Sequence, residues 1–424
     1  MYWEYRGSPV LLLGATIDDN LFQRTHLQSH LDSLKEVGGN YIRNTMSDRD
    51  AGNVRAYHKG TDGKYDLNKW NDVYWNRFEN LLRLTAERDI VVQVEVWDRF
   101  DHSRNEWKSD PYNPKNNINY SHAESRLDSL YPMHPGANRQ PFFYTVPGLD
   151  NNPLLLEYQQ AFVRKLLSVS LAYDHVLYCI DNETSGEEAW AVYWRDFIKS
   201  NTHGKEIFIT QMWDTWDVKA DMHKRTLDHP ERYDFVDLSQ NSQLPGYVNW
   251  ENQQYVFDHI KSDPRPVNST KIYGSDRGPW LDRGITSEHA IQTFFRNLTG
   301  GFASSRFHRP PSGLGLSDPS IHAIKTIRKI EGHVRFWNVI PRMDLLKDVE
   351  QNEAYLAARE GESYLVYFTK GGSVSLDLRG HRGKLRLKWI TIRDSSWSKT
   401  RTLKGGAVVS LEAPHAEGCV GVLY

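Results

Sequence analysis

Short apolar runs alternate with amphipathic stretches along the first three quarters of the chain. Runs of four to eight apolar residues bounded by turn residues are typical of buried strands, and a 3.6-residue apolar period is typical of helices. We predict strands over residues 10–15, 40–45, 90–97, 175–183, 206–213, 235–240, 271–275 and 301–307. We predict helices over residues 25–37, 70–88, 154–173, 187–199, 252–261, 287–298 and 319–330.

Eight strands interleaved with helices favour an α/β fold of the (β/α)₈ TIM-barrel class. A doubly wound open sheet is the rival, but no Gly-rich phosphate-binding turn follows the first predicted strand. From about Arg335 the helical period stops, and short strand-like runs are separated by glycine pairs. We therefore predict a barrel over residues 1–334 and a small all-β sandwich domain over residues 335–424.

A long connection follows the third predicted strand, over residues 99–152. So long a segment within a compact domain usually builds a functional loop. It carries the aromatic residues Trp107, Tyr112, Tyr120, Tyr131, Phe142, Phe143 and Tyr144. We expect it to wall one side of a cleft, which favours a pocket and exo action; a solvated or oligomer-contacting loop is an equal alternative.

Composition narrows the possible partners. Lys and Arg number 52 against 54 Asp and Glu, so neither nucleic acid nor an anionic membrane is an expected partner. No run of 18 apolar residues is present, and the opening residues lack the pattern of a signal peptide, as in a processed or an intracellular protein. The 14 Trp and 22 Tyr suit binding to sugar faces, or they fill a large core. Cys179 and Cys419 predict neither a disulfide framework nor a structural zinc site.

In a TIM barrel the reacting groups project from the carboxyl ends of the strands. The polar and aromatic residues that end the predicted strands therefore form the candidate site. They are Arg43, Trp97, Asp98, Asn182, Glu183, Trp213, Asp214, Gln240, Asn241, Asp276, Arg277, Arg306 and His308. Acidic, amide, aromatic and Arg side chains at one rim are typical of a sugar-binding site, to which Trp216 and Trp280 could add stacking platforms.

Two carboxylates among these residues are the candidate catalytic pair. Glu183 follows Asn182 at the end of the fourth strand, where partial burial could raise its pKa and let it act as an acid. Asp276 lies three β–α units further on, at the end of the seventh strand. The alternatives are that Glu183 caps the next helix and that Asp276 is a turn residue; Asp98 and Asp214 compete with Asp276.

The chain resembles the retaining (β/α)₈ glycoside hydrolases of clan A, and among them the apiosidase-like glycosidases. The similar segments are 7–15, 39–43, 182–183, 364–368, 371–374 and 389–390, the last three in a domain historically named collagen-binding. The resemblance implies that Glu183 is the acid/base and that Arg43 lies near the nucleophile. The strand-7 nucleophile of that group is typically Glu, and Asp276 takes that place here.

The leading hypothesis is therefore a retaining glycosidase acting on a plant- or microbe-derived oligo- or polysaccharide, with no metal or cofactor. Glu183 would be the acid/base and Asp276 the nucleophile. Arg43 and Asn182 would hold the substrate, and Arg306 and His308 would bind hydroxyls or a sugar carboxylate. A catalytically inactive barrel that binds carbohydrate is the second hypothesis. A metal-dependent hydrolase ranks last, because the sequence has no His-x-His pair at the first strand and no His-Glu-x-x-His helix.

Overall fold

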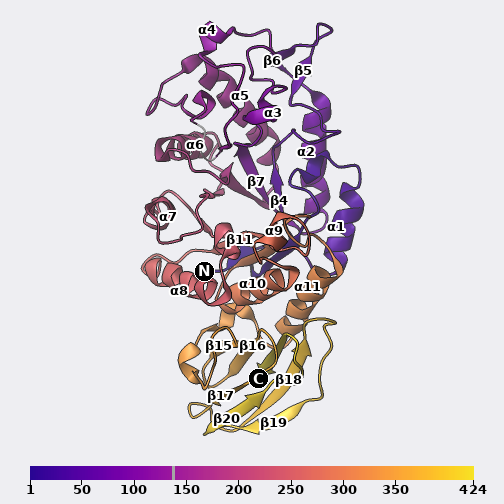
Figure 1. Ribbon diagram of the computed structural model, residues 1–424, viewed down its shortest axis with the longest axis vertical. Coiled ribbons are helices and arrows are strands. Elements are labelled where there is room, and N and C mark those ends of the chain that lie inside the picture. The colour runs from indigo at the N-terminus through magenta and orange to yellow at the C-terminus, as the bar shows by residue number, and fades with distance from the viewer. Residues whose placement is uncertain (136–138) are drawn as a thin grey trace.

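The computed structural model describes residues 1–135 and 139–424 (Figure 1). Its first part is built on one eight-stranded sheet in which all neighbouring strands are parallel, in the order β10-β11-β12-β3-β4-β7-β8-β9. The strands are β3 (Leu12–Ala15), β4 (Tyr41–Thr45), β7 (Val91–Asp98), β8 (Val176–Asn182), β9 (Phe208–Thr210), β10 (Val236–Asp237), β11 (Val267–Ile272) and β12 (Ser304–Phe307).

Hydrogen bonds close this sheet between its two outer strands. The amide of Asp234 donates to the carbonyl of Ile209 over 2.9 Å, and the hydroxyl of Thr210 donates to the carbonyl of Phe235 over 2.6 Å. These bonds tie β9 to the segment that enters β10. The predicted (β/α)₈ barrel is therefore confirmed.

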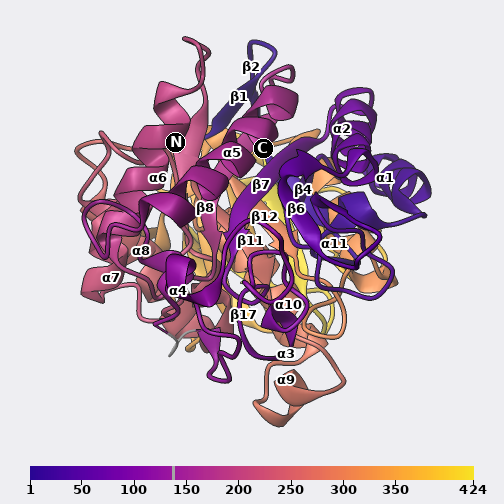
Figure 2. The ribbon, with the colours of Figure 1, turned by 90° about the horizontal axis from the view of Figure 1, so that it is seen from above.

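Helices surround the barrel; Figure 2 shows α1 and α2 on one side of the strands and α6, α7 and α8 on the other. They are α1 (Leu27–Glu36), α2 (Asp72–Ala86), α5 (Pro153–Ser170), α6 (Glu188–Ser200), α7 (Asp221–Leu227), α8 (Gly246–His259), α10 (Ser287–Thr299) and α11 (Asp318–Glu331), with short helices η1 (Leu21–Gln23), η4 (Ser239–Gln243) and α9 (Pro279–Asp282). None of the described helices is long and apolar enough to cross a membrane.

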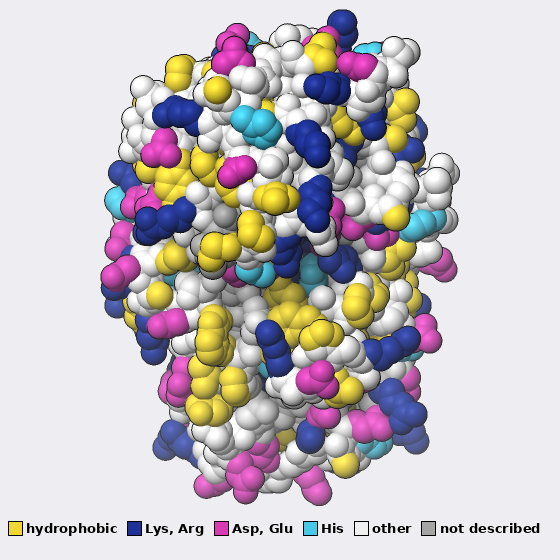
Figure 3. Space-filling view, turned by 45° about the horizontal axis from the view of Figure 1, so that its top comes forward, with side chains coloured by type: hydrophobic (Ala, Val, Ile, Leu, Met, Phe, Trp, Pro, Cys, Tyr) yellow, Lys and Arg dark blue, Asp and Glu magenta, His cyan; other side chains and the backbone are white. Residues whose placement is uncertain are grey.

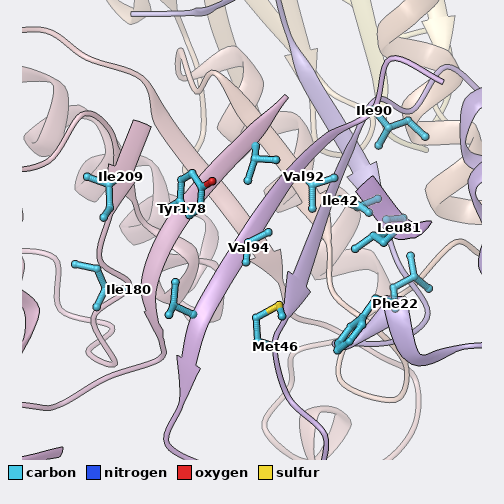
Figure 4. Close-up of a cluster of buried hydrophobic side chains, with 14 of the residues drawn as sticks. Phe22, Ile42, Met46, Leu81, Ile90, Val92, Val94, Tyr178, Ile180 and Ile209 are labelled. Carbon is cyan, nitrogen blue, oxygen red and sulfur yellow. The ribbon is translucent and has the colours of Figure 1, made fainter. Parts of the chain in front are cut away.

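The apolar core lies between the strands and these helices. Figure 4 shows β-branched side chains of β4 and β7, such as Ile42 and Val92, facing Leu81 of α2 and Phe22 of η1. All four side chains are at most 1% exposed. Burial of each such side chain contributes about 1.5–3 kcal/mol, so this layer supplies much of the driving force for closing the barrel.

The seventh strand lies earlier in the sequence than predicted. We expected it over residues 271–275, whereas β11 spans Val267–Ile272. Its polar side chains are buried, and two of them bond to other parts of the barrel: Asn268 accepts a hydrogen bond from Trp3 over 3.0 Å, and Thr270 donates one to Asp237. A buried polar stretch of this kind does not look like a strand in a search for apolar runs.

Two β-hairpins and, outside the connection after β7, two short α-helices were not predicted. One hairpin joins β1 (Trp3–Tyr5) to β2 (Ser8–Val10), and the other joins β5 (Tyr57–Lys59) to β6 (Tyr65–Trp70). The helices are α7 and α9, and α8 begins at Gly246, earlier than expected. None of these differences changes the order of the barrel strands.

The long connection after β7 is a packed segment with short helices, α3 (Arg104–Trp107), α4 (His122–Ser125) and η3 (Pro141–Phe143). Its residues 136–138 lie outside the described residues. Most of its aromatic side chains belong to the barrel's apolar core: Trp107, Tyr112, Tyr120, Phe142 and Phe143 are all at most 6% exposed. These aromatics are therefore structural.

Antiparallel sheets follow the barrel, as predicted. A six-stranded sheet has the order β13-β15-β16-β21-β18-β19, and a three-stranded sheet has the order β14-β17-β20. Their strands are β13 (Ile340–Pro341), β14 (Leu346–Lys347), β15 (Ala354–Arg359), β16 (Ser363–Phe368), β17 (Ser373–Asp377), β18 (Lys384–Thr391), β19 (Arg401–Lys404), β20 (Val408–Glu412) and β21 (Cys419–Leu423), preceded by η5 (Phe336–Asn338) and η6 (Met343–Leu345).

Aromatic side chains join these sheets to the barrel. Tyr367 of β16 stacks on Phe295 of α10 with ring centroids 5.3 Å apart, and Tyr355 of β15 packs against Trp250 of α8 at 4.6 Å. Because these rings belong to the same apolar cluster as the barrel helices, the two parts share one continuous core. Cys179 and Cys419 are free and buried.

Candidate active site

Glu183 lies directly after β8, at the carboxyl end of the fourth barrel strand. Its backbone φ is 44°, in the left-handed region that non-glycine residues seldom adopt, and its side chain is 15% exposed. Such backbone conformations cost about 1–3 kcal/mol and are concentrated at functional sites. The turn at Glu183 is therefore a feature that the surrounding contacts must hold in place.

Three side chains hold the carboxylate of Glu183, and all three reach the same oxygen, Oε1. Lys271 Nζ lies 2.9 Å away, Gln240 Nε2 donates over 2.9 Å, and the hydroxyl of Tyr273 donates a short hydrogen bond. Lys271 and Tyr273 belong to the seventh strand and the residues after it, and Gln240 belongs to η4. All three contacts are thus made to one oxygen of the carboxylate.

These contacts keep Glu183 ionised. Burial by itself raises the pKa of the carboxyl group, but the ammonium of Lys271 and the hydrogen bond from Tyr273 outweigh burial and lower the pKa of Glu183 to about 2. An ionised carboxylate at neutral pH is suited to be a nucleophile or a base. It does not carry the proton that the expected acid role would need in the first step.

Asp214 lies beside Glu183 on the fifth strand's extension. Thr184 pairs with Trp213 in a parallel bridge, in which Thr184 N donates to Met212 O over 2.9 Å and Asp214 N donates to Thr184 O over 2.8 Å. Glu183 and Asp214 flank this bridge on neighbouring strands. Burial and the negative charge of Glu183 raise the pKa of Asp214 to about 7.

The barrel interior beneath the two carboxylates is a buried polar network. Arg43 of β4, which is fully buried, donates to Glu95 over 2.6 Å, to Asn182 over 2.9 Å and, by a short contact, to Asp19. Lys271 also donates to Asn182, so Asn182 connects Arg43 to the group that holds Glu183. Buried charges of this kind are stable only when they are paired, and this pairing fixes the positions of the side chains in the network.

The structure does not bring Asp276 to Glu183. The side chain of Asp276 is exposed, and its Oδ1 accepts a hydrogen bond from Ser287 N, 3.0 Å away, in the first turn of α10. Because β11 ends at Ile272, Asp276 belongs to the loop beyond the strand. The residues at this strand end that contact Glu183 are Lys271 and Tyr273. The position of Asp276 gives no support to its expected role as nucleophile.

Two tryptophans expected to stack on substrate are buried away from the mouth. Trp97 is 2% exposed and packs among Phe142, Phe162 and Trp190. Trp213 is 1% exposed, and its Nε1 donates to Thr226 of α7 over 2.7 Å. Side chains alternate between the two faces of a strand, and these two rings point to the helix layer. This corrects their assignment as sugar platforms.

Four more residues of the predicted site differ in how deeply their side chains are buried. Arg306 is fully buried and donates to Thr270 O over 2.6 Å, so its expected role in binding hydroxyls is corrected: it is a structural group inside the barrel. Arg277 is exposed on the loop with Asp276. His308 is 5% exposed and lies 3.8 Å from Asp19. Asp98 accepts from Arg49 Nη1 over 2.5 Å.

Sequence reasoning missed two residues that contact Glu183 directly. Lys271 and Tyr273 fell within the strand that was placed too late, whereas Gln240 was named among the strand ends. Trp280 of α9 stacks on Tyr273 with centroids 4.3 Å apart, and His308 meets the same ring edge-on at 5.0 Å. An apolar ring thus lies next to the carboxylate site, as a sugar platform would require.

The face shown in Figure 3 has a hollow across the middle of the molecule, with basic and histidine side chains in its depth. Among residues 1–135 and 139–424, no group of three or more His, Cys, Asp or Glu side chains is placed to hold a metal ion. The groups described at the mouth are the carboxyl groups of Glu183 and Asp214, with a Lys, a Tyr and an amide in contact with Glu183.

Comparisons with known proteins agree with this architecture. No family model matches the sequence, and no curated protein matches it either. Solved structures do: one described as a glycoside hydrolase superposes with a TM-score of 0.66 at 13% identity, covering 100% of this chain and 94% of that one. A family 5 glycoside hydrolase from Bacteroides vulgatus gives 0.64 at 14% identity, covering 100% and 91%.

An α-amylase from Geobacillus thermoleovorans, solved in complex with acarbose, gives a TM-score of 0.56 at 12% identity and covers 98% of both chains. At such low identities the similarity concerns the fold alone, and the apiosidase-like subgroup is not among the descriptions of these structures. The match runs over nearly the whole chain, sheets included. The chain has the (β/α)₈ fold of glycoside hydrolases, followed by antiparallel β-sheets.

Proposed function

We propose that the protein is a glycoside hydrolase in which Glu183 and Asp214 are the two catalytic carboxylates. Glu183 acts as the ionised nucleophile and Asp214 as the acid/base. This assignment reverses the role that the resemblance to clan A implies for Glu183, and it replaces Asp276 by Asp214. Substrates are oligo- or polysaccharides, and the reaction retains the anomeric configuration.

Each step follows from the protonation states of the two groups. In the first, Asp214 gives its proton to the glycosidic oxygen while Oε2 of Glu183 attacks the anomeric carbon; the C–O bond breaks, the leaving alcohol departs, and a glycosyl ester remains on Glu183. In the second, Asp214 takes a proton from a water whose oxygen attacks the anomeric carbon. The ester bond breaks, and Glu183 is again a carboxylate.

The observation that carries the proposal is the different surroundings of two carboxyl groups on neighbouring strands. Lys271 and Tyr273 contact Glu183, whereas Asp214 is partly buried beside it, and the pKa values are accordingly about 2 and about 7. Pairs of neighbouring carboxyl groups whose environments push their pKa values apart serve as base and acid at the same pH. Lys271 and Tyr273 on one side, and burial of Asp214 on the other, supply the two environments. Trp280 adds an aromatic face beside them.

Substitution of each carboxylate on a panel of aryl glycosides tests the proposal. Asp214→Asn should lower kcat by about 10²–10⁴ for poor leaving groups and much less for activated ones, because only the former need a proton in the first step. In Asp214→Ala, azide should restore turnover and yield a glycosyl azide of retained configuration. Glu183→Gln should abolish both steps.

Asp217→Asn is the matched control, since Asp217 is exposed three residues further along the same loop. Its activity should equal that of the wild type. Full activity of Asp214→Asn on poor leaving groups would refute the assignment of the acid.

A second candidate, a barrel that binds carbohydrate without cleaving it, is favoured by one observation. The strand-7 position facing Glu183 carries Lys271, a cation that binds the carboxylate instead of a second acid. This candidate predicts affinity for a glycan without any product, even after long incubation at pH 5–7. Product release from any glycan in the panel rules it out.

A further inference from the structure

Arg99 holds the turn that follows Glu183. It is the first residue after β7, and its Nε donates to the hydroxyl oxygen of Thr184 over 2.7 Å. The amide of Gly186 donates to the same oxygen over 3.0 Å. Arg99 is 4% exposed and Thr184 is 1% exposed, so water does not compete for this contact. Because a charged donor makes the stronger kind of hydrogen bond, it fixes the side chain of the residue directly after Glu183.

Thr184 joins the two proposed catalytic carboxylates. Its backbone makes both hydrogen bonds of the parallel bridge: its amide donates to Met212 O over 2.9 Å, and its carbonyl accepts from Asp214 N over 2.8 Å. Glu183 is the residue that directly precedes Thr184 in the chain. A displacement of Thr184 therefore changes the distance between Glu183 and Asp214.

The guanidinium group of Arg99 is itself fixed by its neighbours. Its central carbon lies 4.1 Å from the centre of the Phe143 ring, which belongs to η3 in the long connection and is 2% exposed. Gly186 leaves room for the group, because a Cβ atom at that position would collide with Nη2 of Arg99. The contacts thus run from Phe143 through Arg99 to Thr184, and they link the long connection to the turn at Glu183.

We propose that Arg99 is a positioning residue: through Thr184 it holds Glu183 and Asp214 at the spacing that hydrolysis needs. This inference rests on the proposed function and adds a residue to it. Misplacement of a reacting group by about 1 Å can cost about a hundredfold in rate, so a contact that sets this spacing matters to kcat. A lysine would not replace Arg99, because it lacks the planar group that packs on Phe143.

Substitutions at Thr184 and Gly186 disturb this contact without removing the arginine. Thr184→Val deletes the hydroxyl and should lower kcat about 10–100-fold, with KM within about threefold of the wild type. Thr184→Ser keeps the hydroxyl that accepts from Arg99, and its kcat should stay within about threefold of the wild type. Gly186→Ala should resemble Thr184→Val, since its methyl group displaces the guanidinium. Gly148→Ala is the matched control with unchanged kcat, because a Cβ atom there would meet its nearest neighbour at 3.4 Å, an ordinary contact distance.

The titration of Asp214 separates positioning from a general loss of structure. Burial and the charge of Glu183 raise the pKa of Asp214, and the ammonium of Lys271 lowers it. When the turn loosens, Asp214 should move away from Glu183 and into water, so its pKa should fall below the wild-type value of about 7. The basic limb of kcat/KM should then move to lower pH. Carbon-13 NMR of the carboxyl carbon, assigned by its loss in Asp214→Asn, follows this titration without turnover.

Arg99→Gln should shift the titration in the same direction as Thr184→Val and Gly186→Ala, and these two variants carry the test if Arg99→Gln does not fold. An Asp214 titration equal to that of the wild type in both of them would overturn the proposal, whatever their activity. In an active enzyme, wild-type kcat in both would overturn it as well. A shifted titration in a protein whose wild type hydrolyses no glycan would instead refute the proposed hydrolase function, and Arg99 would still hold the spacing of the two carboxylates.

Discussion

The ammonium group of Lys271 lies 2.9 Å from Oε1 of Glu183, at the position of the seventh strand that faces the fourth. Lys271 is 1% exposed, so this ion pair is largely removed from water. A cation held at this place fixes the charge of Glu183 before substrate arrives. The proposed roles of the two carboxylates, Glu183 as nucleophile and Asp214 as acid/base, follow from this contact.

Replacing Lys271 tests that dependence. In Lys271→Met the pKa of Glu183 should rise from about 2, because burial then acts with less opposition. The acidic limb of the pH profile of kcat/KM should move upward by one unit or more. Loss of one partner of a buried ion pair should also lower the free energy of unfolding by about 3–5 kcal/mol, measured with urea.

Lys199→Met is the matched control. Lys199 pairs with Asp234 over 2.8 Å, but its side chain is 33% exposed, so its loss should cost below about 1 kcal/mol and leave the pH profile unchanged. If Lys271→Met kept the wild-type acidic limb, the role of Lys271 in holding Glu183 ionised would be refuted.

Asp276→Asn should leave activity within about twofold of the wild type. The carboxylate accepts one hydrogen bond from Ser287 N at the start of α10, and an Asn oxygen can accept the same bond. The melting temperature should therefore change little. A loss of kcat of a hundredfold or more, with the protein still folded, would return Asp276 to the catalytic pair.

The raised pKa of Asp101 leads us to expect an unusual pH dependence of stability. Burial raises its pKa to about 7, although Arg49 donates to it over 2.5 Å and Ser47 over 2.7 Å. Because the folded pKa lies above the unfolded value near 3.8, the folded state binds more protons between these values. The contribution of Asp101 is thus most favourable at low pH and is lost as pH rises toward about 7.

In Asp101→Asn this part of the pH dependence should disappear. Unfolding free energies measured with urea from pH 4.5 to pH 8 should fall less steeply for the variant than for the wild type. Asp50→Asn, an exposed residue in the preceding loop, should retain the wild-type slope. Parallel slopes for wild type and Asp101→Asn would show that Asp101 does not hold the proton.

Tyr367 should stabilise the packing of the C-terminal sheets against the barrel. It is 1% exposed and stacks on Phe295 at 5.3 Å. Tyr367→Ala should lower the free energy of unfolding by about 3–5 kcal/mol through the cavity it leaves. Val408→Ala, a substitution at a side chain that is 47% exposed on β20, should change it by about 0.5 kcal/mol at most.

The barrel was predictable because strands rich in β-branched residues, such as β7 (Val91–Asp98), are buried on both faces and stand out in the sequence. The seventh strand was not, since it carries the buried polar residues Asn268, Ser269 and Thr270. Asn268 and Thr270 have hydrogen-bond partners on other parts of the barrel. That displacement moved the candidate nucleophile from the strand to Asp276 in the following loop.

Glu183 was found because a polar pair directly ended an apolar strand. Its protonation state was not predictable, since its pKa depends on Lys271 and Tyr273, which are distant in sequence. The sequence also did not fix which way the side chains of Trp97 and Trp213 point. A shift of one residue along a strand moves a side chain from the barrel interior to the helix layer.

The most direct test of the central claim is to identify the carboxylate that forms the covalent intermediate. A fluorinated glycoside with a good leaving group, chosen from a panel of sugars, traps the glycosyl ester, and mass spectrometry of proteolytic peptides locates it. The account predicts the label on Glu183, and none after Glu183→Gln. A label on Asp276 or Asp214 in the wild-type protein would contradict it.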